Sequence, residues 1–386
     1  MLTRELNLPK EQNFFLLGPR QTGKTTLIRA AFAGKLKEIN LLLSDTFRAY
    51  AAHPEKIREE LKATPDFETH VLIDEVQRIP ELLNEVQALI DGGFKQKFIL
   101  SGSSARKLKR GHANLLGGRA WSYRLFPLTF PETPPSLSLE RVLSCGLIPK
   151  NVLCNDTDAQ ENLRSYVDIY LKEEIEAEAL SRNIGGFIRF LKTAAQSNAE
   201  QLNFSNIADD VGLSSVTIKE YFKILEDTLI GAILPAYAYS ERKRHKTAPK
   251  FYFFDTGVLR AIQGKVSVPL EQGTFDFGNC FETMVINEAQ KISSYLRKDF
   301  QLSFLRTAGD VEVDLLIETP RGELFAVEIK SKKRPVAMDF GRGFAAIRDL
   351  RKDAKCICVS TTEVPLLVEG EDVLPYAKFF EMLRAL

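Results

Sequence analysis

The sequence contains few of the residues that build metal centres and disulfide frameworks. Its 386 residues include five cysteines and four histidines, and none has the CxxC or HxxxH spacing of paired zinc ligands. The odd number of cysteines also argues against a complete set of disulfides. These scarcities predict a reduced, cytoplasmic protein without a zinc site.

The sequence also lacks a charge excess and a long apolar run. Lys and Arg number 52 against 51 Asp and Glu, so the overall charge neither favours nor excludes nucleic acid as a partner. No segment approaches the ~20 uninterrupted apolar residues of a membrane span. The start, MLTRELNLPKEQ, has no apolar signal core. We therefore expect no membrane association.

What the sequence does contain is a change of pattern along its length. From residue 13 to about 131, the β-rich runs NFFLL, EINLLL, HVLID and KFILSG alternate with helical patterns, which is typical of a doubly wound parallel sheet. The proline-rich stretch FPLTFPETPPSLS then interrupts the periodicity, as expected of a connection between domains.

Two further regions follow that connection. Residues from about 140 to 262 are mainly helical by the spacing of their apolar positions. From about residue 275, an amphipathic helix precedes alternating strands, which indicates a separate α/β region. We therefore predict an α/β protein with three domains: residues 1–135 with a parallel sheet and helices on both faces, 136–265 mainly helical, and 266–386 again α/β.

A phosphate-binding loop is predicted between the first strand and the first helix. Residues 18–25, GPRQTGKT, fit the pattern G-x-x-x-x-G-K-[ST] and follow an apolar run. Lys24 can neutralise the β and γ oxygens of ATP, and the Thr25 hydroxyl can coordinate Mg²⁺. A chance glycine-rich turn is the alternative, and the strand-loop-helix context argues against it. The predicted ATP-binding residues are Gly18, Pro19, Arg20, Gln21, Thr22, Gly23, Lys24, Thr25 and Thr26.

Two carboxylates end the strand HVLIDE and are predicted to lie beside this loop. Parallel strands bring their carboxyl ends to one edge of the sheet, where ligands bind. Asp74 is expected to hold Mg²⁺ through its water shell, and Glu75 to orient and deprotonate the attacking water. The alternative is a solvated strand end.

Hydroxyl and guanidinium groups complete the predicted catalytic set. The strand KFILSGSS ends in serines, and we favour Ser103, with Ser101 as the alternate, as the group that senses the γ-phosphate. A serine that only hydrogen-bonds its own turn is equally consistent with the position. Arg119, in LLGGRA, is predicted to neutralise charge on the γ-phosphate in cis or across a subunit interface. An ordinary surface arginine is the alternative.

The segments GPRQTGKTTL, VLIDEVQRIPELLNEVQALID, FILSGSSARKL and LLGGRA together closely resemble a widespread prokaryotic family of AAA-type ATPases. Members of that family typically carry a C-terminal domain of unknown function. The segments RSYVDIYLKEEI, KFYFFDTGVLRAI, GNCFETMVINE, EVDLLI and VEIKS resemble that second part. The resemblance implies a AAA-like P-loop core, a central winged-helix module and a terminal domain of restriction-endonuclease-like topology. Where the family often has an Arg-Asp pair, this sequence has Glu173-Glu174, so the role of that pair is not carried over.

The middle region has the spacing of a helix-turn-helix. FSNIADDVGLSSVTIKEYFKILED predicts a helix, a tight turn at Gly212, and a second helix capped by Ser214 or Ser215. Double-stranded DNA is a candidate partner, although winged helices also bind proteins. The residues expected to face DNA are Ser215, Thr217, Lys219 and Lys223 on the second helix and the basic run Arg242, Lys243, Arg244 and Lys246.

The terminal region has the D-(x)n-(D/E)-x-K arrangement of metal-dependent nucleases. In that arrangement Asp314 and Glu328 would bind Mg²⁺ or Mn²⁺, Lys330 would position or activate water, and Glu282 would complete the metal shell. Charged residues that alternate along a strand are more often a solvated face, and a domain with such a motif can be inactive.

Three functions are compatible with these motifs. The first is a Mg²⁺-dependent ATPase whose nucleotide state acts on the winged-helix and nuclease-like parts. The second is a nucleotide-dependent protein-interaction switch with little hydrolysis. The third is a metal-dependent nuclease that ATP licenses. A homo-oligomer would be required if Arg119 acts across subunits.

Overall fold

The computed structural model describes residues 2–63, 69–103, 116–171, 183–237 and 247–386. The chain forms two compact units. One, the N-terminal unit, contains residues 3–126 together with 227–230. The other, the C-terminal unit, contains residues 1–2, 127–226 and 231–386.

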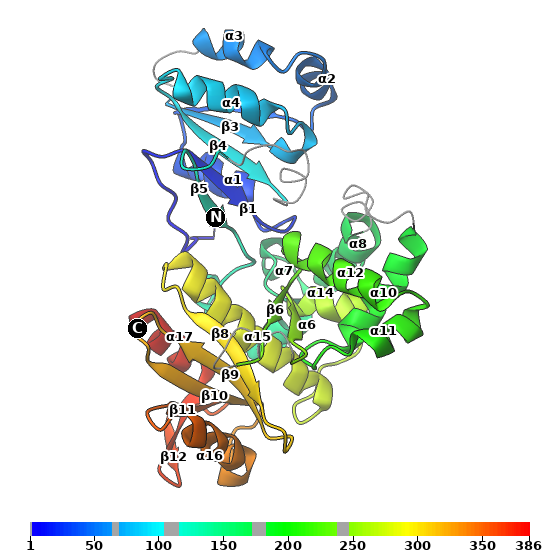
Figure 1. The fold of residues 1–386 in the computed structure, drawn as a ribbon, viewed down its shortest axis with the longest axis vertical. Coiled ribbons are helices and arrows are strands. Elements are labelled where there is room, and N and C mark those ends of the chain that lie inside the picture. Colours follow the sequence, from blue (N-terminus) through cyan, green and yellow to red (C-terminus); the bar gives the residue numbers. More distant parts are fainter. Residues whose placement is uncertain (1, 64–68, 104–115, 172–182, 238–246) are drawn as a thin grey trace. The chain divides into compact units, whose positions relative to one another are not determined.

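The N-terminal unit is built on a five-stranded parallel sheet, as predicted, with strand order β2-β3-β4-β1-β5 (Figure 1). Every neighbouring pair in it is parallel. The strands are β1 (Phe14–Leu17), β2 (Leu36–Asn40), β3 (His70–Asp74), β4 (Lys97–Gly102) and β5 (Trp121–Arg124). The helices are α1 (Lys24–Ala31), α2 (Ser44–Ala52), α3 (Lys56–Lys62), the short η1 (Val76–Arg78) and α4 (Leu82–Asp91).

Apolar residues on both faces of this sheet are covered. Phe15 and Ile73 point to one face and share a buried cluster with Leu83 of α4. Phe14 points to the other face, where its ring lies 6.2 Å from that of Phe32, directly after α1. The strands are apolar along nearly their whole length because both faces of the sheet are buried, which is why these runs predicted a parallel sheet.

The C-terminal unit begins with helices. They are η2 (Phe130–Glu132), α6 (Leu139–Cys145), α7 (Pro149–Val152), α8 (Asp156–Ser165), the π-helical η3 (Tyr166–Leu171), α10 (Ile184–Gln196), α11 (Phe204–Val211) and α12 (Ser215–Asp227). Strands β6 (Gly231–Leu234) and β7 (Lys250–Phe253) then pair antiparallel. Helices α14 (Thr256–Ile262) and α15 (Phe275–Tyr295) lead to a second sheet.

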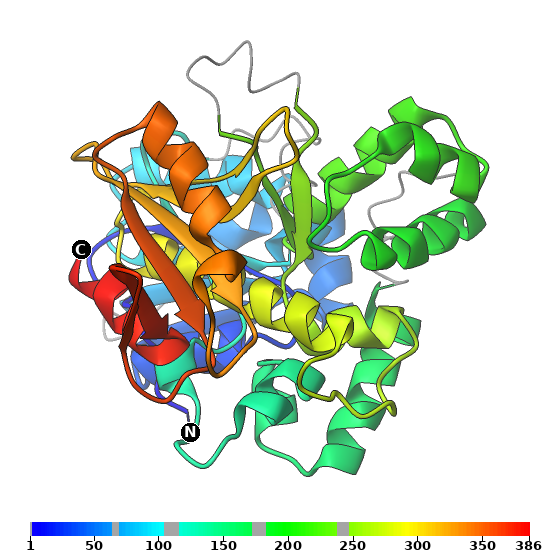
Figure 2. The same cartoon turned by 90° about the horizontal axis from the view of Figure 1, so that it is seen from below.

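That second sheet is mixed and has the order β12-β13-β11-β10-β9-β8. Its strands are β8 (Gln301–Arg306), β9 (Glu312–Glu318), β10 (Leu324–Lys330), β11 (Lys355–Ser360), β12 (Leu366–Val368) and β13 (Glu371–Pro375). Helix α16 (Gly341–Leu350), with η4 (Ala337–Asp339) before it, lies across one face (Figure 2). Helices α15 and α17 (Tyr376–Ala385) pack in the core of the opposite face.

One hydrophobic core joins the helical segment to this sheet. It contains Leu143 from α6 and Tyr252 from β7 together with Phe281 from α15 and Val327 from β10. The predicted boundary between residues 265 and 266 therefore runs through a single compact unit. The three-domain division remains a prediction.

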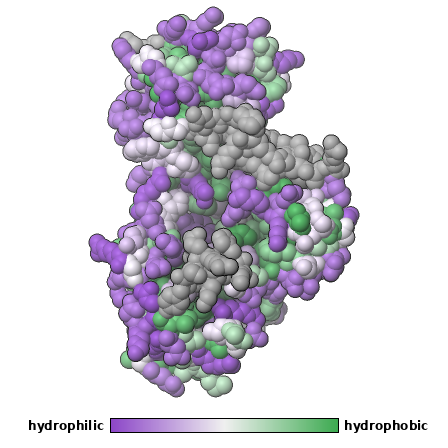
Figure 3. Space-filling model, in the orientation of Figure 1, coloured by the Kyte–Doolittle hydropathy of each residue, from purple (hydrophilic) through white to green (hydrophobic). Residues whose placement is uncertain are grey.

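The face of the molecule drawn in Figure 3 is largely hydrophilic, with hydrophobic residues in small patches. Among the residues that the structure describes, no helix is both long and apolar enough to cross a bilayer.

Candidate functional site

The loop after β1 has the close backbone packing expected of a phosphate cradle. A Cβ on Gly18 would lie 2.2 Å from the carbonyl oxygen of Leu125, so only glycine fits there. Gly23, the N-cap of α1, has a φ of 89°, and Gln21 has a φ of 63°. Left-handed residues that alternate with other conformations turn backbone N–H groups towards one concavity, which is a geometry that binds anions.

Side chains hold this loop in place from inside and outside. The Lys24 Nζ is buried and donates to the carbonyl oxygens of Gly18 (2.8 Å) and Pro19 (3.0 Å). From outside, the Arg4 guanidinium donates to the carbonyl oxygens of Thr22 (2.7 Å) and Phe126 (2.8 Å). The loop is therefore preorganised within the N-terminal unit.

The N-terminus of α1 is capped by a residue without a side chain. Gly23 is the N-cap and so cannot accept a hydrogen bond from the first amides of this helix, in the way that a serine or aspartate would. Unsatisfied N–H groups and the helix dipole favour an anion at that position. Arg20 and Gln21 are half-buried in the same loop.

Asp74 ends β3 beside this loop. Its Oδ2 accepts a hydrogen bond of 2.9 Å from the Thr25 hydroxyl, and its Oδ1 accepts one from the Ser101 hydroxyl. Asp74 and Ser101 are register partners on β3 and β4, so the adjacent strands place both groups at the carboxyl edge. The alternate serine, Ser101, is thus the one that contacts Asp74.

Glu75 and Ser103 are joined by a residue that the sequence did not single out. The Gln77 Nε2 donates to Glu75 Oε2 at 2.5 Å and to Ser103 Oγ at 3.2 Å. Glu75 has a φ of 60°, and this left-handed turn directs the chain from β3 into η1. Burial raises the pKa of Glu75, with Asp74 adding to the rise, whereas Lys24 and Gln77 oppose it.

Arg119 precedes β5, which runs parallel to β1, and therefore lies towards the amino edge of the sheet. Its guanidinium pairs with Asp91, the last residue of α4, at 2.6 and 3.1 Å. Its carbonyl oxygen accepts from Asn13, the residue before β1. The phosphate loop follows the far end of β1, about 13 Å away at ~3.3 Å per residue. A role for Arg119 at the γ-phosphate, in cis or across subunits, remains a prediction.

The terminal carboxylates form a compact group with a lysine. The last paired residues of the antiparallel ladder between β9 and β10 are Leu315 and Val327. Asp314 and Glu328 are their neighbours along the two strands and therefore lie close together. The Lys330 Nζ lies 3.2 Å from Asp314 Oδ2 and 2.7 Å from Glu328 Oε2. We call these three residues, Asp314, Glu328 and Lys330, the carboxylate–lysine trio.

Charges within the trio shift one another. Burial raises the pKa of Glu328 to about 9, and the negative charge of Asp314 adds to the rise. Burial also opposes ionisation of Asp314. However, Lys330, Lys250 and a 2.7 Å hydrogen bond from the Ile329 amide hold the Asp314 pKa below its ordinary value. One proton therefore prefers Glu328 in the absence of a cation.

Glu282 contacts a different set of groups. The Tyr252 hydroxyl donates to its Oε1 at 2.6 Å, and the Lys250 Nζ lies 3.3 Å from the same oxygen. Burial raises the pKa of Glu282, and Asp314 adds to the rise. Within the described ranges, no group of three or more His, Cys, Asp or Glu side chains is arranged to hold a metal ion. The predicted metal shell of Asp314, Glu328 and Glu282 is therefore not assembled, and it remains a proposal.

The helix-turn-helix segment is present as two helices around a left-handed glycine. Gly212 has a φ of 73° between α11 and α12, and Ser214, one of the two predicted caps, accepts from the Thr217 amide at 3.1 Å. Lys223 pairs with Glu226 at 3.2 Å. Residues 242–246 and the pair Glu173-Glu174 lie outside the described residues.

Comparison with known proteins agrees with the order of these parts. Residues 10–133 match a family described as AAA domain. Residues 136–268 and 277–379 match two families described as domains of unknown function, DUF8612 and DUF4143. The N-terminal unit is thus similar to the nucleotide-binding domain of AAA-type ATPases.

The relatives are uncharacterised. An uncharacterised protein of Mycobacterium tuberculosis is 26% identical over 323 residues, which cover 83% of this chain and 70% of the relative. A Mycobacterium bovis protein has the same values. An uncharacterised protein of Haemophilus influenzae is 24% identical over 225 residues, covering 54% of this chain and 56% of its own length.

Sequence reasoning missed Arg4, Gln77, Lys250 and Tyr252. Gln77 lies two residues after Glu75. A polar residue so close to an acid at a strand end is a signal that could have predicted a contact with that acid. Arg4 and Lys250 gave no such signal, since their partners are far away in the sequence. Only the fold brings Lys250 to Glu282.

Proposed function

We propose that the N-terminal unit binds ATP with Mg²⁺ and hydrolyses it. The observation that carries this proposal is the 2.9 Å hydrogen bond from Thr25 Oγ1 to Asp74 Oδ2. It joins the end of the phosphate loop to the carboxyl end of β3, across 49 positions of sequence. A helix N-terminus, a lysine and a carboxylate are thereby gathered at one edge of a parallel sheet.

The residues present fit a nucleotide triphosphate. The first amides of α1 would donate to phosphate oxygens, since the left-handed Gly23 has no side chain to cap them. Lys24 would exchange its contacts with loop carbonyl oxygens for contacts with β and γ oxygens. Arg4 keeps the loop in position meanwhile.

The same edge fits a hard cation. The Thr25 hydroxyl and the Asp74 carboxylate are oxygen donors of the kind that Mg²⁺ prefers, with water completing an octahedron. When bound, Mg²⁺ would neutralise phosphate charge. Asp74 is held by Ser101, so its carboxylate is already oriented.

Glu75 is the proposed base for the attacking water. Its raised pKa strengthens it as a proton acceptor, and the amide of Gln77 fixes one of its oxygens. Ser103 would act through Gln77, as part of the same hydrogen-bonded row. This row sits beside the phosphate loop and gives hydrolysis a structural basis.

The test is phosphate release from Mg²⁺ATP, with and without duplex DNA. We expect Lys24→Ala to lose nucleotide binding, and Glu75→Gln to retain binding while turnover falls by a factor of at least ~10². Asp349→Asn, an exposed acid in α16, is the matched control. If the slow turnover of the wild type survives in Glu75→Gln, the protein is a nucleotide-dependent switch instead.

A second candidate function is metal-dependent hydrolysis of phosphodiesters by the C-terminal unit. The specific observation is the carboxylate–lysine trio, in which Lys330 bridges two carboxylates from adjacent strands. Asp314 and Glu328 would bind the cation, and Lys330 would position water. In this proposal residues 266–386 are a restriction-endonuclease-like domain and α11, α12, β6 and β7 a winged helix.

This second function has its own test. Nicking of supercoiled plasmid in Mn²⁺ or Mg²⁺ should disappear in Asp314→Ala and persist in Asp349→Asn. Absence of cleavage with every DNA and RNA substrate would contradict it. Duplex DNA as a partner of α12 belongs to this second proposal. A homo-oligomer in which Arg119 acts across subunits belongs to the first, the ATPase. ATPase activity per molecule that rises with protein concentration would support the oligomer.

A further inference from the structure

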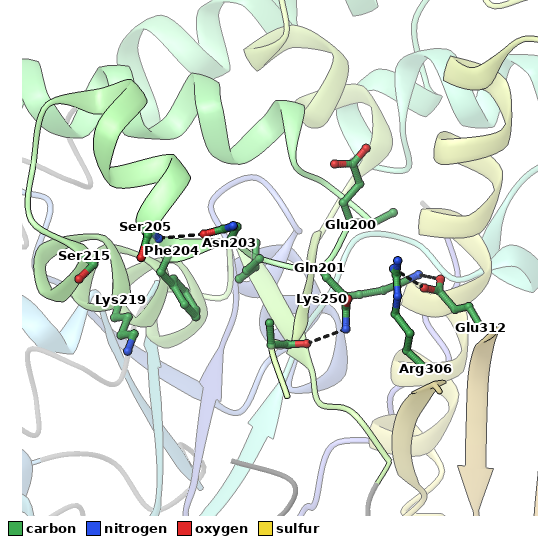
Figure 4. A pocket seen from close by; sticks show the side chains of 13 residues that line it. Glu200, Gln201, Asn203, Phe204, Ser205, Ser215, Lys219, Lys250, Arg306 and Glu312 are labelled. Atoms are coloured by element: carbon green, nitrogen blue, oxygen red, sulfur yellow. Dashed lines mark hydrogen bonds and ion pairs between the residues drawn. The ribbon is translucent and has the colours of Figure 1, made fainter. Parts of the chain in front are cut away.

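An open groove of about 700 Å³ lies in the C-terminal unit, and its lining includes Ser215 and Lys219 of the set expected to face DNA. Figure 4 shows the two groups of side chains that line it. One group comes from the first turns of α11 and α12, and the other from β7, β8 and β9. Its volume is within the range of ligand-binding sites.

The first wall combines an aromatic ring, a cation and hydroxyl groups. Lys219 Nζ lies 5.4 Å from the centre of the Phe204 ring, and Lys219 has no carboxylate partner among the residues that the structure describes. Ser205 and Ser215 are the neighbouring hydroxyls, as Figure 4 shows. Two helices also begin at this wall, so their dipoles favour negative charge there.

The second wall is connected to the carboxylate–lysine trio. Lys250 lines the groove and pairs with Glu312 at 2.5 Å, and Arg306 lies 3.3 Å from the same carboxylate. Burial lowers the pKa of Lys250, but Glu282, Asp314 and Glu312 together raise it above its ordinary value. Glu312 itself lines the groove and lies two residues before Asp314 on β9, so the second wall leads along this strand to the trio.

We propose that this groove binds a single strand of nucleic acid and guides it to the carboxylate–lysine trio. The inference rests on the second proposed function, since it names the substrate of that site. A base would stack on Phe204 while Lys219 and the hydroxyls of Ser205 and Ser215 bind backbone phosphates. Each base has an aromatic face, so such a wall accepts any sequence.

The aromatic ring in the first wall favours a single strand over a duplex. Phe204 is half-buried, and its ring packs at 5.8 Å against that of Phe222, so it is fixed at the base of the first wall. Paired bases would not present their faces to such a ring, whereas unpaired bases can. The groove is also open, which suits a chain that continues beyond it at both ends.

The test measures binding by the full-length protein, without ATP or divalent metal, to fluorescently labelled single-stranded DNA, single-stranded RNA and a duplex of equal length. We expect a single strand, DNA or RNA, to bind more tightly than the duplex. Phe204→Leu should weaken binding about ten-fold or more. Thermal melting of Phe204→Leu checks that the fold is intact.

Lys219→Gln provides a variant that does not touch the core. It should lower the slope of log affinity against log salt by about 0.7, as expected when one phosphate contact to a single strand is lost. Lys192→Gln, at an exposed position of α10 outside the groove, is the matched control and should leave the slope unchanged. Equal slopes in the two variants, or tighter binding of the duplex, would overturn the proposal.

The same experiment separates this inference from the function on which it rests. Asp314→Ala should bind single strands at least as well as the wild type, because its carboxylate repels phosphate. If single strands bind through Lys219 and Phe204 but are never cut, the proposed binding groove is supported and the proposed phosphodiesterase activity is refuted. If plasmid is nicked but neither groove variant weakens the binding of single strands, the proposed binding groove is refuted and the proposed phosphodiesterase activity is supported.

Discussion

Replacing Gln77 with methionine should slow ATP hydrolysis without weakening the fold. Gln77 is 6% exposed and donates at 2.5 Å to Glu75 and at 3.2 Å to Ser103. Methionine has nearly the same length and no polar amide, so it fills the space but makes neither bond. The change therefore isolates the hydrogen bonds of this side chain.

The expected effect on stability is small because two contributions oppose each other. A hydrogen bond to a charged group contributes about 1.5–3 kcal/mol. However, the Gln77 Oε1 is buried and has no hydrogen-bond partner in the described part of the chain. An unsatisfied buried oxygen costs about 1–3 kcal/mol, and methionine removes that cost. We expect the free energy of unfolding to change by less than about 1 kcal/mol.

Turnover should respond much more strongly than stability. If the bond to Glu75 holds the base in its reactive orientation, losing about 1.5–3 kcal/mol in the transition state lowers kcat roughly 10- to 150-fold. The KM for ATP should stay near the wild-type value, because Gln77 does not belong to the phosphate loop.

Steady-state phosphate release and urea unfolding measure both quantities on one preparation. Ser103→Ala is the control, since it removes only the partner at 3.2 Å, and its kcat should fall less than that of Gln77→Met. Wild-type turnover in Gln77→Met would refute the positioning role of this amide. A loss of more than about 3 kcal/mol of stability would instead show that the two hydrogen bonds are chiefly structural.

Three further substitutions test other parts of the structure. Arg4→Ala frees the outer side of the phosphate loop, so the KM for ATP should rise several-fold with little change in kcat, as steady-state kinetics will show. Gly18→Ala places a methyl group 2.2 Å from the carbonyl oxygen of Leu125, so nucleotide binding should be lost in a titration with a fluorescent ATP analogue. Lys250→Met leaves Glu282 buried without its cation, which should cost about 3–5 kcal/mol of stability in urea unfolding.

The parts of the fold that the sequence predicted correctly are those set by local patterns. The parallel sheet follows from short apolar runs buried on both faces, and the strand-loop-helix around Gly18 and Lys24 is contiguous in sequence. Asp74 ends an apolar run, and its place at the carboxyl edge of the sheet follows from strand direction alone.

The parts that could not be predicted depend on contacts between distant residues. The motif around Arg119 carries no information about which edge of the sheet it will reach, and the direction of β5 places it at the amino edge. Glu282 was expected to face the carboxylates. Its hydrogen bonds with Tyr252 and Lys250 arise only because β7 packs beside α15, and no spacing in the sequence records that packing.

The single core of the C-terminal unit has a consequence for how this chain can be divided. Helix α15, with 21 residues, is about 31 Å long and carries buried residues along its whole length. Those residues face both the helices that precede it and the sheet that follows. A fragment ending at residue 265 would leave the apolar surface around Leu143 and Tyr252 in water. We therefore expect the helical part and the carboxylate-bearing sheet to unfold together, as one cooperative unit.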